Sequence, residues 1–360
     1  MDCECEINGL EVETGIAIYE IVFGQVQIEI TGRCNMNCEH CRAAHDRSDD
    51  MPLEQIAKIV KFARRYSPSY KELLVSGGEP LIHRDFSRVL SWIRNNGGDF
   101  VTLTTNGSLL REEHLDLFAE LAFERLTLSV SLDSLHPLSH DTFRGFSGAF
   151  HLAVNAIEAI VNRSIPGVVA SIRTTLKPNQ IDEMPMFAQF AYDSGCQRIS
   201  FSAIHPAGKS IERPDFWMTA EEKRRFINTV YELKGQYPDT FNITTNDPLK
   251  CLVRGMSNVG GEGELVFDGC PAAAVTFNVN ANGDMTPCAL LNVPMMNVFG
   301  MSVDEIAVAY QQSDIVKDML DMNLSGKCGG CDRKYQCGGC RARAFIRNGD
   351  LFAEDPDCWL

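Results

Sequence analysis

Short β-branched or apolar runs alternate with amphipathic segments between residues 26 and 237. The runs predict six strands, at 26–31, 72–76, 100–104, 126–131, 168–174 and 198–203. Each is followed by a predicted helix, at 53–66, 85–95, 111–122, 150–162, 182–193 and 220–237. Six consecutive βα units of roughly thirty residues imply parallel strands joined by right-handed crossovers. Because six units are too few to close an eightfold barrel, we expect an α/β fold built on an open, partial (β/α)6 barrel.

The chain on either side of this region has a different pattern. Residues 1–25 predict a small hairpin, with strands at 11–13 and 17–19. After about residue 240 a loop at 255–263, a hairpin at 275–284 and two helices at 303–312 and 314–321 are predicted. The last thirty or so residues are rich in cysteine and glycine and have too little core of their own, so we expect metal to hold them. We therefore divide the chain into three parts, 1–25, 26–240 and 241–360.

Charge and cysteine content limit the classes of function. The chain has 33 Lys and Arg against 48 Asp and Glu, a net charge of −15. That balance argues against nucleic acid and favours a neutral or cationic partner. No secretory signal and no apolar run of about 20 residues is visible, so we expect no membrane span and a cytoplasmic protein. Fourteen cysteines in such a chain point to metal or redox chemistry in a reducing compartment.

Three of these cysteines directly follow the first predicted strand. Cys34, Cys38 and Cys41 have the spacing C-x3-C-x2-C. Thiolates at this spacing can converge on zinc or on an iron–sulfur cluster. Either a fourth ligand lies elsewhere, or one iron keeps an open position for a substrate. A zinc site completed by His40 or His45 is the alternative.

A glycine-rich turn follows the second predicted strand, with the sequence Ser76-Gly77-Gly78-Glu79-Pro80. Parallel strands carry their reactive loops at the same edge, so this turn is expected beside the cysteine loop. The two glycines let a ligand approach the backbone closely, and Glu79 supplies a carboxylate for a cationic group.

Together the two motifs resemble those of the radical S-adenosylmethionine (radical SAM) enzymes. The resemblance implies a 4Fe–4S cluster on the three cysteines, whose fourth iron takes the amino and carboxylate groups of S-adenosylmethionine. It implies that Gly77, Gly78 and Glu79 meet the methionine amino group. Reduction of the cluster would release a 5′-deoxyadenosyl radical, which takes a hydrogen atom from an unactivated C–H bond.

Four more strand-end positions are similar to positions of this superfamily. Asn106 follows the third strand, Ser131 ends the fourth at the place of a ribose-facing residue, and Asn179 follows the fifth. Arg144 lies in a segment whose arginine meets the methionine carboxylate in relatives. The alternative for each is an ordinary polar residue at the end of a strand.

Seven later cysteines form a second pattern, C-x2-C-x5-C-x2-C-x17-C preceded by two single cysteines. A pair of zinc ribbons is one interpretation. The full pattern is similar to the SPASM extension of radical SAM enzymes, which holds auxiliary iron–sulfur clusters, although the gap before the penultimate cysteine is two residues where three are usual. The resemblance assigns one cluster to Cys328, Cys331, Cys337 and Cys358. It assigns the other to Cys270, Cys288 and Cys340, with Cys251 as a candidate fourth ligand and an open iron site as the alternative.

The resemblance implies a net oxidation, such as cross-linking, dehydrogenation or decarboxylation. The predicted substrate is a ribosomally made peptide in natural-product maturation, and the electron donor a flavodoxin or ferredoxin. Only about 25 residues precede the first barrel strand, too few for a leader-binding domain, so a peptide would need a separate recognition protein. Ala289 stands where sulfatase-maturing relatives have an aspartate base, which argues against their reaction.

Two alternatives stay open. One is a small-molecule substrate, such as a tetrapyrrole, an aminosugar or a nucleoside. The tail around Cys337 to Cys358 resembles the tetrapyrrole-decarboxylating and pyrroloquinoline-quinone branches. The other is a zinc-ribbon binding protein without catalysis.

Overall fold

The structure is a computed structural model that describes residues 9–43, 48–67, 72–254 and 268–360. The predicted loop at 255–263 and His45 lie outside the described residues.

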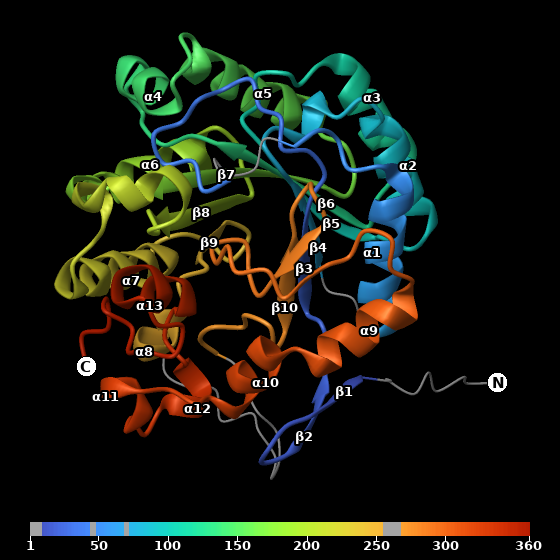
Figure 1. Cartoon of the computed structure of the whole chain (residues 1–360). Helices are drawn as coiled ribbons and strands as arrows, with labels where there is room; N and C mark the ends of the chain where they lie inside the picture. The colour runs from blue at the N-terminus through green and yellow to red at the C-terminus, as the bar shows by residue number, and fades with distance from the viewer. Residues whose placement is uncertain (1–8, 44–47, 68–71, 255–267) are drawn as a thin grey trace.

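A single large sheet forms the centre of the described chain (Figure 1). Its strand order is β12-β11-β10-β3-β4-β5-β6-β7-β8-β9, and the strands from β10 to β9 are parallel. The six predicted strands correspond to β3 (Gln25–Glu29), β4 (Glu72–Ser76), β5 (Phe100–Thr105), β6 (Arg125–Ser131), β7 (Val168–Leu176) and β8 (Arg198–Ala203). The prediction of a partial α/β barrel is confirmed.

The sheet is larger than the sequence predicted, because it takes in strands after residue 240. β9 (Asn242–Thr245) pairs with β8, and β10 (Thr276–Val279) pairs in parallel with β3. The predicted hairpin at 275–284 is β10 and β11 (Asp284–Thr286), extended by β12 (Met296–Asn297). The first and third parts of the chain also touch each other through β1 (Leu10–Glu13) and β2 (Ile18–Ile21), the predicted N-terminal hairpin. There the Thr14 hydroxyl donates to Asp321 at 2.6 Å.

Helices cover the outer face of the barrel sheet (Figure 1). The six predicted ones are α1 (Leu53–Arg65), α2 (Phe86–Asn95), α3 (Glu112–Leu121), α5 (Ala149–Arg163), α6 (Met184–Asp193) and α7 (Ala220–Lys234). α4 (Pro137–Arg144) was not predicted; proline at its first position starts it, and Gly145 with φ +60° ends it after two turns.

Smaller helices build the C-terminal region. They are α8 (Cys251–Arg254), α9 (Val303–Gln312), α10 (Asp314–Asp321), α11 (Gly326–Gly329), α12 (Lys334–Cys337) and α13 (Arg341–Asn348). Five 3₁₀ helices occur at Pro80–Ile82, Pro178–Glu183, Gly208–Glu212, Pro214–Phe216 and Pro248–Lys250. α9 begins with a reciprocal pair of hydrogen bonds between Ser302 and Glu305 and packs on α1 and β1.

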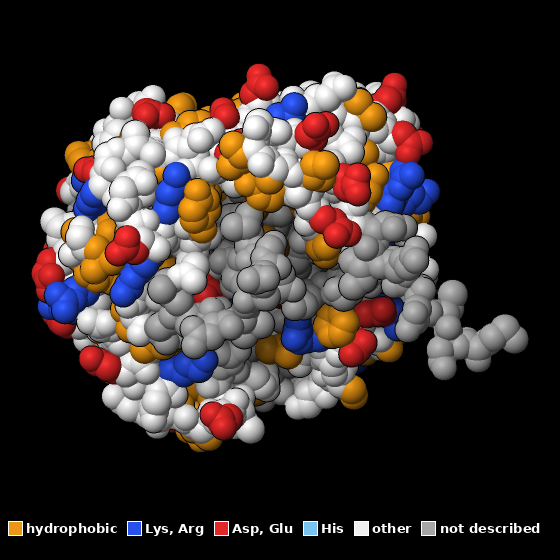
Figure 2. All heavy atoms as spheres, turned by 90° about the horizontal axis from the view of Figure 1, so that it is seen from below, with side chains coloured by type: hydrophobic (Ala, Val, Ile, Leu, Met, Phe, Trp, Pro, Cys, Tyr) orange, Lys and Arg blue, Asp and Glu red, His pale blue; other side chains and the backbone are white. Residues whose placement is uncertain are grey.

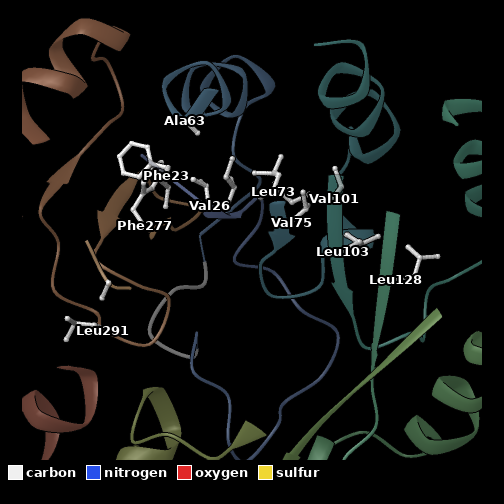
Figure 3. Close-up of a cluster of buried hydrophobic side chains, with 14 of the residues drawn as sticks. Phe23, Val26, Ala63, Leu73, Val75, Val101, Leu103, Leu128, Phe277 and Leu291 are labelled. Carbon is white, nitrogen blue, oxygen red and sulfur yellow. The ribbon is translucent and has the colours of Figure 1, made fainter. Parts of the chain in front are cut away.

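Alternate strand residues face opposite sides of the sheet, and the apolar set faces the helices. Figure 3 shows Val26, Leu73 and Val75 beside Ala63 of α1, with the same layer continuing through β5 and β6. The opposite set of positions faces the inside of the barrel and is largely polar. The sheet thereby separates a helix-covered core from a polar interior.

The longest described helices, α5 and α7, have 15 residues, and no helix in the described ranges is long and apolar enough to cross a bilayer. Figure 2 shows Lys and Arg side chains interspersed with Asp and Glu on one face of the molecule.

Candidate active site

The loop that carries Cys34, Cys38 and Cys41 follows β3 at the carboxyl edge of the sheet. Cys38 is buried and the other two are half-buried. The loop is held from two sides, because the Glu39 amide donates to Phe143 in α4 at 2.9 Å and the Lys209 amide donates to the Cys41 carbonyl at 3.0 Å. The backbone therefore presents the three thiols from a fixed loop.

The glycine turn after β4 lies directly against this loop. The Gly78 amide donates to the Thr31 carbonyl at 2.7 Å, and the Glu79 amide donates to the Arg33 carbonyl at 2.8 Å. A Cβ on Gly78 would lie 2.1 Å from the Arg33 carbonyl oxygen, and one on Gly77, at φ +151°, would lie 2.3 Å from that of Thr31. Both glycines are thus needed for the two loops to meet.

The carboxylate of Glu79 is buried and bridges the ends of β4 and β5. It accepts from the Thr105 hydroxyl at 2.7 Å, from the Asn106 amide at 2.7 Å and from the Leu81 amide at 3.3 Å. Burial raises the pKa of Glu79, and these hydrogen bonds oppose that rise. A cationic ligand would further favour the ionised carboxylate.

Asn106 connects this edge back to the cysteine loop. Its side-chain amide donates to Asn35 at 3.0 Å, Asn35 donates to Ser108 at 2.8 Å, and Ser108 donates to the Asn106 oxygen at 2.6 Å. Ser131 is buried at the end of β6, while Asn179 lies in the 3₁₀ helix Pro178–Glu183.

Arg144 reaches the cysteines from α4. Its guanidinium lies 2.5 Å from the Asp133 carboxylate and 3.8 Å from the Cys38 sulfur. Burial raises the pKa of Cys38, and Arg144 opposes the rise. Its Nε is buried without a hydrogen-bond partner in the part of the chain described. The structure therefore brings Glu79, Asn106 and Arg144 to the loop that carries the three cysteines.

Arg42, which the sequence did not single out, joins the two cysteine regions. Its guanidinium pairs with Glu29 at 2.6 Å and donates to the Ala289 carbonyl at 3.1 Å. Burial would lower the pKa of Arg42, but Glu29 and the nearby thiolates of Cys41 and Cys288 hold it above its ordinary value. An arginine after a cysteine has no distinctive spacing, so only the fold reveals this role.

Cysteines of the two predicted cluster groups lie close together. The Cys270 amide donates to the Cys337 carbonyl at 3.0 Å, and Cys270 and Gly338 line the same small cavity. Burial raises the pKa of Cys340, the Arg343 guanidinium opposes this rise, and the thiols of Cys270 and Cys288 add to it. Burial likewise raises the pKa of Cys328 and of Cys358, with a contribution from Cys337 in both cases.

Two cysteines complete this arrangement. Cys331 follows Cys328 by a tight turn, with its amide 3.4 Å from the Cys328 carbonyl. Cys251 hydrogen-bonds to the thiol of Cys337, and this contact lowers the pKa of Cys251. The candidate fourth ligand of the Cys270 group therefore touches a member of the other group.

The surroundings of these groups suit an anionic, sulfur-rich cofactor. Arg341 is buried beside a small cavity that Cys270 and Gly338 also line. Its Nη1 donates to two carbonyls, but Nε and Nη2 have no partner among the described residues. The Asp355 amide points at the Cys328 sulfur at 3.4 Å. Such N–H groups are the donors that stabilise iron–sulfur clusters. Within the described ranges, no three His, Cys, Asp or Glu side chains are grouped so as to hold a single metal ion.

Comparison with known proteins agrees with this geometry. Residues 28–191 match the family model of the Radical SAM superfamily. The AdoMet-dependent heme synthase of Methanosarcina barkeri is 28% identical over 343 residues, covering 92% of this chain and 94% of that protein. Mycofactocin maturase MftC of Mycolicibacterium smegmatis is 25% identical over 336 residues, covering 92% and 81%.

Among solved structures, Streptococcus suis SuiB bound to its precursor peptide SuiA superposes with a TM-score of 0.76. The match covers 95% of this chain and 77% of SuiB at 16% identity, so it speaks for the fold alone.

Proposed function

On the premise that this chain is a radical SAM enzyme, we propose that Cys34, Cys38 and Cys41 hold a 4Fe–4S cluster whose fourth iron binds S-adenosylmethionine. The observation that carries this proposal is the convergence of the cysteine loop, the Gly-Gly-Glu turn and the α4 arginine at one edge of the sheet. When bound, the reduced cluster supplies the electron that cleaves S-adenosylmethionine to methionine and a 5′-deoxyadenosyl radical, which removes a hydrogen atom from the substrate.

Different residues around the cluster contact different groups of S-adenosylmethionine. Glu79 supplies negative charge for the methionine amino group, and the unpartnered Nε of Arg144 supplies a donor for the methionine carboxylate. Ser131 and Asn106 extend the site along the ends of β6 and β5. Asp133 keeps Arg144 in place, so Arg144 enters the site already oriented.

The later cysteines are assigned to two auxiliary clusters, one on Cys328, Cys331, Cys337 and Cys358 and one on Cys270, Cys288 and Cys340. Cys251 is the candidate fourth ligand of the Cys270 cluster, with an open iron site as the alternative; its contact in the structure is with Cys337 of the other cluster. Auxiliary centres beside the barrel give the substrate radical an electron acceptor, which is what a net oxidation requires. A flavodoxin or ferredoxin would supply the initiating electron.

Two substrate classes follow from the relatives. The heme synthase, which this chain covers over 94% of its length, supports a tetrapyrrole. Loss of a hydrogen atom from a propionate side chain, then of carbon dioxide and one electron, would leave a vinyl group. The maturase supports the peptide substrate that the resemblance to SPASM-containing enzymes implies. A peptide substrate would come with a separate recognition protein.

Anaerobic reconstitution tests the radical assignment. Three 4Fe–4S clusters predict about twelve iron per chain, and dithionite with S-adenosylmethionine should yield 5′-deoxyadenosine. Cys38→Ala should abolish that product, whereas Cys196→Ala, a buried cysteine in the apolar core, should keep it. Stoichiometric zinc without iron, or continued product from Cys38→Ala, would contradict the proposal.

Turnover separates the two substrate classes. Iron coproporphyrin III, which carries propionate side chains that can become vinyl groups, should lose carbon dioxide if the substrate is a tetrapyrrole. A short precursor peptide encoded beside this chain should instead change mass if the substrate is a peptide. Mass spectrometry of both reactions decides between them.

A further inference from the structure

The inner face of β6, β7 and β8 carries two arginines among serines. In the strand register, Ser131 of β6 lies opposite Arg173 of β7, which lies opposite Ser200 of β8. One step toward the amino ends, Ser171 lies opposite Arg198. Arg173 and Arg198 are therefore diagonal neighbours on one face, with a serine beside each. The intervening residues, such as Ile172 and Ile199, belong to the apolar core on the other face.

These two arginines differ from Arg42 and Arg144 in having no ion-pair partner within 4 Å among the described residues. Arg42 pairs with Glu29 at 2.6 Å and Arg144 pairs with Asp133 at 2.5 Å. Neither Arg173 nor Arg198 forms an ion pair with any residue of the described ranges. The inner face of β7 and β8 therefore carries two arginines that no carboxylate of the described chain pairs with.

Several polar groups on this face of β7 and β8 have no hydrogen-bond partner in the described part of the chain. Nε of Arg198 and the hydroxyls of Ser171 and Ser200 are buried and lack a hydrogen-bond partner among the described residues. Buried polar groups in native proteins are nearly always paired, so a cluster of unpaired donors marks a place where a ligand completes the bonding. The guanidinium groups can only donate and the serine hydroxyls can donate as well, so the cluster favours an anion.

Electrostatics agrees with this geometry. Burial lowers the pKa of Arg173 to about 10, repulsion from Arg42, Arg198 and Arg144 adds to the effect, and the nearby Asp133 carboxylate opposes it. A buried cation surrounded by like charges destabilises the free protein, and an oxyanion placed between the guanidinium groups would relieve that repulsion.

We propose that Arg173 and Arg198, with the hydroxyls of Ser171 and Ser200, bind a carboxylate of the substrate inside the barrel. The guanidinium fork matches the two oxygens of a carboxylate, and the serines donate to the same oxygens. S-adenosylmethionine is a poorer occupant, because Arg144 already offers its carboxylate a donor beside the cysteines.

This inference rests on the proposed function and narrows its substrate. Arg173 is level with the end of β6, and Arg198 is two residues further from that edge, about 7 Å at the rise of a strand. The site would therefore anchor the substrate below the edge that carries the cysteines, leaving its reactive C–H bond directed upward.

Thermal unfolding of the reconstituted holoenzyme tests the site with propionate as the probe. Propionate replaces chloride at constant ionic strength, without reductant or S-adenosylmethionine. Wild-type protein should be stabilised in a saturable way, and Arg173→Gln should need about 10- to 100-fold more propionate, the loss of a charge-assisted contact. Arg88→Gln, which removes an exposed arginine of α2 paired with Asp85, should respond like wild type.

Four results of the ligand-binding measurements would overturn the inference. They are equal responses to propionate in wild type and Arg173→Gln, no stabilisation of either, stronger stabilisation by phosphate than by propionate, and a tenfold loss of S-adenosylmethionine affinity in Arg173→Gln with its propionate response intact. In chloride alone, Arg173→Gln should melt no lower than wild type, because it removes an unpaired charge; a lower melting temperature would make Arg173 structural and also overturn the inference. Failure of the proposed function is seen separately, as absence of 5′-deoxyadenosine from the wild-type enzyme.

Discussion

Replacing Arg343 by methionine should detach the C-terminal cysteine region from the barrel. Arg343, in α13, is 1% exposed and lies at the centre of a buried group of charges. It pairs with Asp247, which follows β9, at 2.8 Å, with Asp355 at 2.7 Å and with Asp357 at 3.4 Å. Lys223 of α7 completes the group by pairing with Asp247 at 2.9 Å.

The magnitude follows from the burial of these groups. Removing one partner of a buried ion pair leaves uncompensated charge and costs about 3–5 kcal/mol of unfolding free energy. With an unfolding entropy of about 2.1 cal/mol/K per residue, this loss lowers the melting temperature of this chain by about 4–7 °C. Arg347→Met is the matched control in the same helix: Arg347 is 29% exposed and pairs with Asp357 at the rim, so about 1 kcal/mol or less should be lost.

Arg343→Met should also affect the cysteines, because Asp355 contacts two of them. Its carboxylate accepts the Cys340 amide at 2.7 Å, and its own amide points at the Cys328 sulfur. Iron per chain after reconstitution should therefore fall in Arg343→Met and stay near the wild-type value in Arg347→Met. If both variants melt within a degree or two of each other and bind equal iron, the buried charges do not hold the two regions together.

Three further changes test separate parts of the structure. Gly78→Ala places a Cβ against a backbone carbonyl of the cysteine loop and should lower iron binding and 5′-deoxyadenosine formation at least tenfold, whereas Gly15→Ala, which meets nothing within 4 Å, should change neither. Cys251→Ser should lower the iron of the auxiliary clusters by elemental analysis, and Cys196→Ala should leave it unchanged. His205 is half-buried, with its Nδ1 inaccessible to solvent, and desolvation lowers its pKa to about 3, so it takes up a proton only on unfolding. Its contribution to stability is complete above pH 6.5 and falls by about 2 kcal/mol by pH 5. Denaturant titrations across that pH range should show that the unfolding free energy of His205→Gln falls less with pH than that of the wild type. An equal dependence on pH in both proteins would contradict this reasoning.

Local sequence patterns were sufficient to predict most of the strands and helices of the barrel. Strands such as β7 are long and β-branched, and helices such as α7 begin at a Thr219–Glu222 capping box, so period and caps agree. β9 was not predicted, because its four residues include polar ones and give periodicity too little to work with. β10 was predicted as part of a hairpin, but its place in the main sheet was not. The pairing of β10 with β3 joins segments some 250 residues apart in the chain, which no local pattern specifies.

The residues of the site likewise fall into those that a local motif reveals and those that only the fold reveals. Motif residues such as Cys34 and Glu79 could be found because their spacing is distinctive. Arg42 and Arg343 could not, since each acts through partners far along the chain; Arg343 and Asp247 are 96 residues apart. Arg173 left a readable signal: serines and an arginine alternate with apolar residues along β7 and β8, which is the pattern of a strand with one polar face.

Local charge, rather than net charge, decides what this barrel can hold. A total of −15 favoured a neutral or cationic partner. Yet the interior and the cysteine regions gather arginines, of which Arg42 and Arg144 are balanced by carboxylates and Arg173 and Arg198 are not. A group inside the barrel interacts through protein with charges a few ångströms away, whereas dissolved ions screen the carboxylates on the surface. The acidic surface therefore does not prevent an anionic substrate from binding inside, and the unpaired arginines favour one.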